Sequence, residues 1–261
     1  MKKPWITIFL LVFLAVTPFA QKADPNDPAN VEKGKKLLQQ TIEVRGGASL
    51  LSFKTMDAQG HYTPYEQGAS TTPTPFHDFL ILPDKERTDF GKGKKKDRKI
   101  NVNVGATGWV YDGDAETLKD QTDKQVKDFH DSRESDLEML LRAAVQNKNA
   151  EVRFYGREET RPGERADVIS IKLKNTFLIR LDPTTKLPAT MSYEKAEEQG
   201  TARYEYRFNQ YVPYDGVKFP NIVDLYRNGI QISRVNYQSI KLNVEIPETL
   251  FAKPANAKAV K

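Results

Sequence analysis

Apolar and polar side chains alternate along two long parts of the chain, residues 53–113 and 151–243. The segments DVISIKLK and RYEYRFN show the alternation most clearly. Successive side chains of a strand point to opposite faces of a sheet, so each segment has one apolar face and one face that suits water. The pattern predicts a sheet whose dry face needs a cover. The apolar positions of the two segments are Ile169, Ile171, Leu173, Tyr204, Tyr206 and Phe208.

Turn-forming residues separate these strands at short intervals. The dipeptides Asp112-Gly113 and Asn228-Gly229 are sequences that favour tight two-residue hairpins. Strands that follow one another so closely pair with their neighbours in antiparallel fashion, and we expect about ten or eleven of them.

A helix is predicted near the start of the patterned region. Asp27 followed by Pro28 is a favourable pair for the N-cap and the first helical position, and Gly46 and Gly47 end the helix after Arg45. Its apolar positions fall on one face, which indicates a helix packed against the sheet. These positions are Val31, Leu37, Leu38 and Ile42.

Two further helices are predicted in the middle of the chain, at residues 122–131 and 135–147. Each begins with a capping-box pattern, TDKQ in the first and SDLE in the second. The second carries an apolar stripe at helical spacing that must cover something apolar. The stripe consists of Leu137, Leu140, Leu141 and Ala144.

Together these elements predict a mainly β fold of the α+β class, in which a large curved antiparallel sheet is covered by few helices. A sheet of this size under so small a cover leaves room for a cavity on its apolar face. We expect a single domain, residues 31–254, after a polar linker, residues 24–30, and before a flexible tail, residues 255–261.

The first 23 residues are typical of a secretory signal. Lys2 and Lys3 precede an apolar run, Trp5–Val16, and cleavage is expected after Ala20 or Ala23. An uncleaved membrane anchor is the alternative, but it needs roughly 20 apolar residues, more than this run provides. The sequence thus predicts an exported protein, and the mature chain is expected to be soluble.

The chain contains no cysteine. Disulfides, thiolate metal sites and the lipid-modified cysteine of a bacterial lipoprotein are therefore excluded. The mature protein must be held together by packing, without a lipid anchor.

The formal net charge of +5 is concentrated in one loop, Gly91–Lys99, which itself carries +5. Without the two lysines of the export signal, the rest of the chain is mildly acidic. The loop lies between two predicted strands and contains no aromatic residue, which argues against nucleic-acid binding. It is either a solvated hairpin tip or a docking patch for anionic lipid head groups or an acidic partner. Its basic residues are Lys92, Lys94, Lys95, Lys96, Arg98 and Lys99.

No catalytic or metal-binding pattern stands out. The histidines His61, His77 and His130 lack metal-ligand spacing, and no nucleophile elbow, zincin helix or phosphate-cradling loop is present. Carboxylates are so frequent that a pair such as Asp182 and Glu194 carries no weight. We expect a protein that is not an enzyme and that uses neither metal nor cofactor.

Several segments resemble, in order, the LolA-like outer-membrane lipoprotein-sorting proteins, especially their longer divergent members. The resemblance covers nearly the whole mature chain. Its most specific parts are the turn LDPTTKLP, the hairpin DGVKFP and the closing stretch Asn243–Phe251. Other matching segments are GKKLLQQTIEVRGGASLLSFKTM, LPDKERTDF and GWVYDG.

The resemblance implies a periplasmic protein with an incomplete antiparallel β-barrel, lidded by helices over an apolar concave face. In the family's best-understood members this cavity accepts the acyl chains of lipoproteins. It also implies an arginine in the first helix that hydrogen-bonds the lid; Arg45 lies in that helix, but its surroundings, VRGG, differ, so we assign it no role.

Candidate residues for such a cavity follow from the alternation: Trp109 and Tyr111, together with the six apolar positions of DVISIKLK and RYEYRFN. The stripe from Leu137 to Ala144 is the candidate lid face. Ordinary core packing is the alternative role for all of them. We expect a monomer that binds lipoprotein acyl chains or lipid, with no nucleic acid among its partners.

Two other functions remain open. The same cavity could serve a lipid-sensing or protein-interaction domain that regulates a partner in the cell envelope. The second alternative is a hydrolase whose nucleophile the sequence does not reveal.

Overall fold

The computed structural model describes residue 24 and residues 27–260. The predicted export signal, residues 1–23, lies outside the described residues. The expected linker is shorter than predicted, because helix α1 begins at Pro28.

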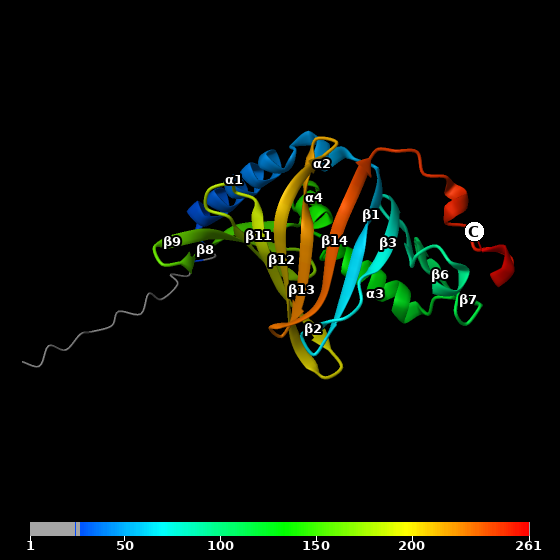
Figure 1. The fold of residues 1–261 in the computed structure, drawn as a ribbon. Coiled ribbons are helices and arrows are strands. Elements are labelled where there is room, and N and C mark those ends of the chain that lie inside the picture. The colour runs from blue at the N-terminus through cyan, green and yellow to red at the C-terminus, as the bar shows by residue number, and fades with distance from the viewer. Residues whose placement is uncertain (1–23, 25–26, 261) are drawn as a thin grey trace, which may run out of the picture.

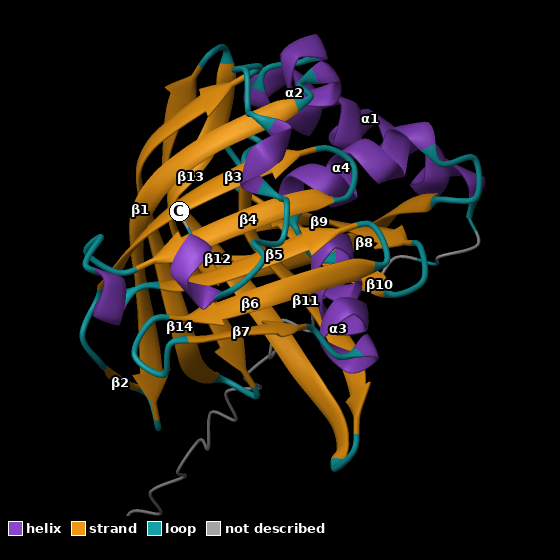
Figure 2. Cartoon of the chain, turned by 90° about the vertical axis from the view of Figure 1, so that its right-hand side faces the viewer, coloured by secondary structure: helices purple, strands orange, loops and turns teal. Residues whose placement is uncertain are grey.

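The described chain forms one antiparallel sheet of 14 strands (Figures 1 and 2). Two meanders, β1 with β3 to β7 and β8 to β14, are joined where β1 pairs with β14. The outermost strands, β7 and β8, are not paired with each other, so the sheet stays open, as predicted. The strands are β1 (Thr55–Glu66), β2 (Ala69–Ser70), β3 (Thr74–Ile81), β4 (Lys85–Phe90), β5 (Lys99–Val104), β6 (Thr107–Asp112), β7 (Thr117–Asp120), β8 (Glu151–Arg161), β9 (Glu164–Lys172), β10 (Thr176–Leu181), β11 (Pro188–Glu197), β12 (Gly200–Tyr214), β13 (Val217–Arg227) and β14 (Ile230–Leu242).

Tight turns fix the register of the second meander. Asn228 and Gly229 both have positive φ, 50° and 81°, and they connect strands whose flanking residues pair directly. Asp215 and Gly216 make a turn of the same kind before β13. Such turns match the twist of the flanking strands, which is why Asn228-Gly229 predicted its hairpin correctly. The two-residue turn expected at Asp112-Gly113 does not form, because Asp112 pairs with Thr117 and residues 113–116 connect β6 and β7.

Helix α1 (Pro28–Arg45) has the predicted caps. The Asp27 carboxylate accepts a hydrogen bond from the Ala29 amide at 2.9 Å, and Gly46 ends the helix with a φ of 131°. Gly34 lets the helix approach the sheet closely, because a Cβ there would lie 2.4 Å from the carbonyl carbon of Arg153. A short helix, α2 (Ala48–Ser52), follows and leads into β1.

The central helices are α3 (Asp123–Glu134) and α4 (Leu137–Gln146). The capping box at Thr122 forms as predicted. The one expected at Ser135 does not, because Asp136 caps α4 by accepting a hydrogen bond from the Met139 amide at 3.1 Å. Glu138 is thereby free to make other contacts.

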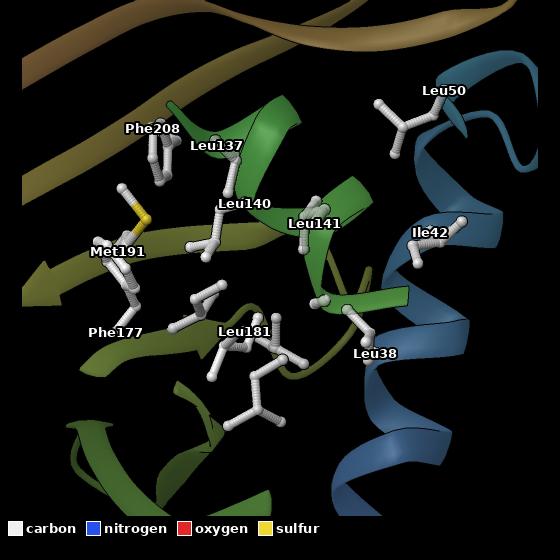
Figure 3. Packing of buried hydrophobic residues seen from close by; sticks show 14 of the residues in the cluster. Leu38, Ile42, Leu50, Leu137, Leu140, Leu141, Phe177, Leu181, Met191 and Phe208 are labelled. Carbon is white, nitrogen blue, oxygen red and sulfur yellow. The ribbon is translucent and has the colours of Figure 1, made fainter. Parts of the chain in front are cut away.

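The main core lies between the concave face of the sheet and helices α1, α2 and α4. In Figure 3, Leu137 and Leu140 of α4 lie near strand residues, while Ile42 comes from α1 on the other side. Leu140, Leu141 and Ile42 are almost completely buried. The apolar stripe of α4 thus does cover an apolar surface.

A second, smaller core lies under the C-terminal segment, beside β4 to β7 (Figure 2). Phe251 and Ile246 pack there against Trp109, whose indole N–H donates a hydrogen bond to the Phe251 carbonyl at 3.0 Å. Ala257 and Val260 also pack on this cluster, so residues that we expected in a flexible tail contact the sheet.

Truncating the fully buried Leu140 to alanine should lower the free energy of unfolding by about 2–5 kcal/mol, because it leaves a cavity where α4 meets the sheet. Urea unfolding followed by circular dichroism measures the change. Val145→Ala is the matched control: Val145 lies on the same helix with 47% of its surface exposed, and its loss should change stability by less than about 1 kcal/mol. Equal effects of the two variants would contradict the packing described.

Candidate functional site

A cavity of about 200 Å³ lies between the concave face of the sheet and the region where α3 meets α4. Most of its wall is apolar and comes from five strands and from α4. The lining residues are Phe53, Met56, Leu80, Ser132, Ser135, Asp136, Leu137, Glu138, Met139, Tyr206, Phe208, Phe219, Pro220, Val223, Val235 and Tyr237.

The polar side chains of the wall are gathered at one place. Ser132 lies in the last turn of α3, Ser135 lies in the junction, and Asp136 and Glu138 begin α4. Across the cavity, the Tyr206 hydroxyl lies 3.4 Å from Ser135 Oγ. The cavity is therefore amphipathic, with an apolar floor on the sheet and a polar end at the α3–α4 junction.

Three of the predicted site residues line the cavity: Tyr206 and Phe208 of β12, and Leu137 of α4. The others have different surroundings. Ile169, Ile171, Leu140, Leu141 and Ala144 are buried in the main core, Leu173 packs at its border, and Tyr204 stacks on Tyr193 and donates a hydrogen bond to Glu197.

Trp109 and Tyr111 do not lie on the cavity side of the sheet. Residues that pair directly on neighbouring strands point to the same face of the sheet. Trp109 pairs with Val102, Val102 with Arg87, and Arg87 with Phe79, so these four side chains share one face. The next residue, Leu80, lines the cavity, so Trp109 points the other way. The alternation predicted strand β6 correctly, but it did not show which face of β6 points toward the cavity. Both faces of β6 are covered, one of them by the C-terminal segment.

The sequence interpretation missed the cavity residues of β1, β3, β13 and β14. Val223, Val235 and Tyr237 occupy alternating positions in their strands, so the same pattern was available there. Their strands also carry half-buried polar residues, which obscures the alternation.

An ion pair ties helix α1 to the start of α4. Arg45 is completely buried, and its Nη2 donates a hydrogen bond to the Glu138 carboxylate. Its Nε donates to the Lys218 carbonyl at 3.0 Å, and the guanidinium lies over the rings of Tyr211 and Phe219. Since Arg45 follows Leu38 and Ile42 at helical spacing, a lone arginine on an apolar stripe was the signal for this contact.

The pKa values of the pair reflect burial and mutual attraction. Burial opposes the charge on Arg45, but the Glu138 carboxylate, together with Tyr211 and Asp136, outweighs it and raises the arginine's pKa. Burial also raises the pKa of Glu138, against the opposing effect of Arg45. Each charge is thus kept in the interior by the other.

A second cluster of polar side chains lies on the concave face beside the cavity. Asp78 of β3 accepts a hydrogen bond from Thr88 at 2.8 Å, and Glu86 of β4 accepts one from Arg133 of α3 at 3.3 Å. Burial raises the pKa of Asp78 to about 6. Burial, followed by repulsion from Asp78, raises that of Glu86 to about 8. Arg133 Nε and Nη2 find no hydrogen-bond partner among the described residues.

The basic loop is a hairpin tip between β4 and β5, as predicted. Two of its cations have acidic partners: Arg98 contacts Asp89 at 2.6 Å and Lys99 contacts Asp112 at 3.5 Å. Lys92, Lys94 and Lys96 are exposed. The loop is therefore anchored at its C-terminal end and presents these three lysines to solvent.

In the part of the chain that the structure describes, no group of three or more His, Asp or Glu side chains could hold a metal ion. Among the same residues, no helix has both the length and the apolar character that a bilayer span needs.

Replacing Arg45 by Met should lower the free energy of unfolding by about 3–5 kcal/mol, because Glu138 is left as a buried, unpaired carboxylate. Adding Glu138→Leu should recover part of this loss, since no buried charge then remains. Chemical unfolding of both single variants and the double variant measures the coupling. Lys124→Met, which breaks an exposed pair with Asp128 on α3, is the control and should change stability by less than about 1 kcal/mol. Additive effects of the two buried substitutions would show that the charges are not coupled.

No protein-family model matches the sequence, and no curated protein matches it. Solved structures do. A LolA superfamily protein from Nitrosomonas europaea has a TM-score of 0.54 at 10% identity, over 84% of this chain and 97% of that one. A DUF1329 family protein from Desulfovibrio piger has a TM-score of 0.55 at 11% identity, over 85% of this chain and 97% of that one. A putative outer membrane lipoprotein-sorting protein domain from Vibrio parahaemolyticus has a TM-score of 0.53 at 14% identity, over 86% of this chain and 98% of that one. At such identities the likeness establishes the fold, and this chain has the LolA-like fold that its sequence predicted.

Proposed function

We propose that this protein is an exported carrier that takes up the acyl chain of a lipoprotein or lipid in the cavity between the sheet and the α3–α4 junction. The apolar floor of that cavity is the observation that carries the proposal. An acyl chain in water is unfavourable by about 0.8 kcal/mol per CH₂, so a carrier must provide a dry surface for it. The name of the Vibrio parahaemolyticus neighbour, a lipoprotein-sorting domain, supports this cargo class.

Uptake of a whole acyl chain requires the cavity to widen. Its volume of about 200 Å³ is below the roughly 300–1000 Å³ typical of ligand pockets. Helix α4 is a poor moving part, because Leu140 and Leu141 are fully buried and Glu138 is tied to Arg45.

Helix α3 is better suited to open the cavity. None of its residues is buried, and polar contacts hold it in place. Asp131 pairs with Lys174 at 2.8 Å, and His130 contacts the Gly105 carbonyl at 2.8 Å. Segments with little apolar burial open at low free energy, so we assign the lid to α3 and the fixed wall to α4.

The remaining parts of the proposal concern location and chemistry. We place the protein in the periplasm on the strength of the predicted export signal, and we assign it no catalytic step, since binding and release are sufficient for a carrier. A sensor or interaction domain would use the same cavity but would also hold a protein partner.

Native mass spectrometry of protein gently extracted from cells distinguishes these functions. Co-purified lipid or acylated peptide supports the carrier. Stoichiometric capture of a protein partner, insensitive to lipid, would favour the interaction domain, and turnover of ester substrates would favour the hydrolase.

Replacing Val223 by Phe should weaken the binding of decan-1-ol about tenfold, because the ring takes the place of about two CH₂ groups of ligand at 0.8 kcal/mol each. Isothermal titration calorimetry measures the affinity, and thermal unfolding verifies the fold. Ile230→Phe places the same aromatic ring beside a turn, where 54% of the residue is exposed, and it should bind like the parent. No binding by the parent, or equal binding by both variants, would refute a ligand site in this cavity.

The basic loop gives the carrier a proposed docking point on an anionic membrane. Changing Lys94, Lys95 and Lys96 to serine should weaken the binding of the protein to phosphatidylglycerol vesicles about tenfold or more at low salt. Each cation adds roughly 1 kcal/mol of attraction to the anionic surface. Vesicle co-sedimentation measures this, and the difference should shrink in high salt.

The control replaces Lys119, Lys148 and Lys258, three exposed lysines elsewhere, and should retain more vesicle binding. Decan-1-ol should bind all of these variants equally. If the loop and control variants bind vesicles alike, the loop is only a solvated turn.

A further inference from the structure

Carboxylates from three parts of the fold converge on one phenol in the cavity wall. Tyr237 of β14 lines the cavity. Its pKa is raised by burial first, and then by the negative charges of Asp78, Asp136, Glu138 and Glu86. Strand β3 and its neighbour β4 contribute Asp78 and Glu86, which lie beside the cavity, and the start of α4 contributes Asp136 and Glu138, which line it.

Guanidinium groups balance only part of this charge. Arg45 of α1 pairs with Glu138, and Arg133 of α3 contacts Glu86 at 3.3 Å and Asp136 at 3.5 Å. Four carboxylates therefore face these two guanidiniums around the polar end of the cavity. A third guanidinium, that of Arg142 on α4, acts on Asp136 and donates a hydrogen bond to the Phe53 carbonyl at 3.0 Å, which still leaves one carboxylate more than there are guanidiniums. His77 alternates with Asp78 along β3 and contacts Asp57 on the outer face, and its lowering effect on the pKa of Asp78 is smaller than those of burial, Thr88, Arg133 and Asp136.

In the unliganded protein, the remaining negative charge is removed by protonation of carboxyl groups. Glu86, with a pKa raised by burial and by Asp78 to about 8, is largely protonated at neutral pH. The pKa of Asp78 is raised by burial to about 6. A carboxyl that is held neutral by crowding with other carboxyls ionises when a cation arrives, because the new charge lowers its pKa.

We infer that the cavity selects acyl chains whose polar end is a positively charged amine over chains that end in a carboxylate. The inference rests on the proposed function, because it specifies the ligand of the same cavity. Lysine and arginine are absent from the described lining residues, whereas Asp136 and Glu138 are among them. With the chain on the apolar floor, the ligand's polar end can meet protein groups only at the α3–α4 junction.

Three probes with the same decyl chain test the inference: decylammonium, decan-1-ol and decanoate. At neutral pH and below micelle-forming concentrations, calorimetry should show decylammonium binding about tenfold more tightly than decanoate, with decan-1-ol between them. The alcohol reports the apolar floor alone, so differences from it report the polar end.

The variant Asp136→Asn, combined with Glu86→Gln, should reduce the preference for decylammonium over decanoate about tenfold, and decan-1-ol binding measured in parallel reports any change in the apolar floor. Asparagine caps a helix as well as aspartate does, so α4 keeps its start. Asp123→Asn removes an exposed charge from α3 and serves as the control that should retain the preference.

The pH dependence has a defined sign. Between pH 6 and 8, Asp78 and Glu86 lose protons, the site becomes more negative, and decylammonium, which stays protonated, should bind more tightly. Calorimetry in buffers of different ionisation enthalpy should detect a proton released on binding. Decan-1-ol should bind independently of pH in this range.

The outcomes separate this inference from the carrier function. If all three probes bind equally, the cavity takes acyl chains without regard to charge, and only the inference is wrong. If decanoate binds most tightly, Arg133 rather than the carboxylates sets the preference, and the inference is again wrong. If none of the probes binds, the proposed carrier function fails with it.

Discussion

The concave face of an open sheet is the constraint that the rest of this structure must meet. A curved sheet whose edge strands do not pair leaves one apolar face in water unless helices cover it. Helix α4 fills the middle of that face with Leu140 and Leu141, and α1 closes it from the side, where Gly34 permits close contact with β8. The buried pair of Arg45 and Glu138 then fixes how these two helices meet.

The helices cover the concave face of the sheet unevenly, and the cavity lies where this cover is weakest. Over β9 to β11 the helices contribute leucines, and no residue of these three strands lines the cavity. Over β3 and β4 the concave face carries Asp78 and Glu86, and Arg133 of α3 contacts Glu86 there. Since polar contacts exchange readily with water, whereas buried leucines do not, the two halves of the cover differ in how easily they open.

The sequence predicted the elements better than their surroundings. Alternation in DVISIKLK and RYEYRFN, the Asn228-Gly229 turn and the stripe of α4 each follow from local geometry, and all of them appear in the structure. Which face of β6 turns inward does not follow from local geometry, because the C-terminal segment, over 130 residues later, supplies the cover for Trp109. The same is true of Arg45, whose partner is 93 residues away.

The polar end of the cavity is where local rules fail most. In SDLE the capping pattern predicts that Ser135 and Glu138 bond to each other's backbone, yet Asp136 caps the helix and Glu138 bonds Arg45. Asp136 and Glu138 thereby both face the cavity, one as a cap and the other as half of an ion pair. A shift of the cap by one residue is enough to bring these carboxylates to Tyr237. A conflict between local preference and tertiary structure is typical of binding sites in general, whose groups are arranged for a ligand as well as for the fold.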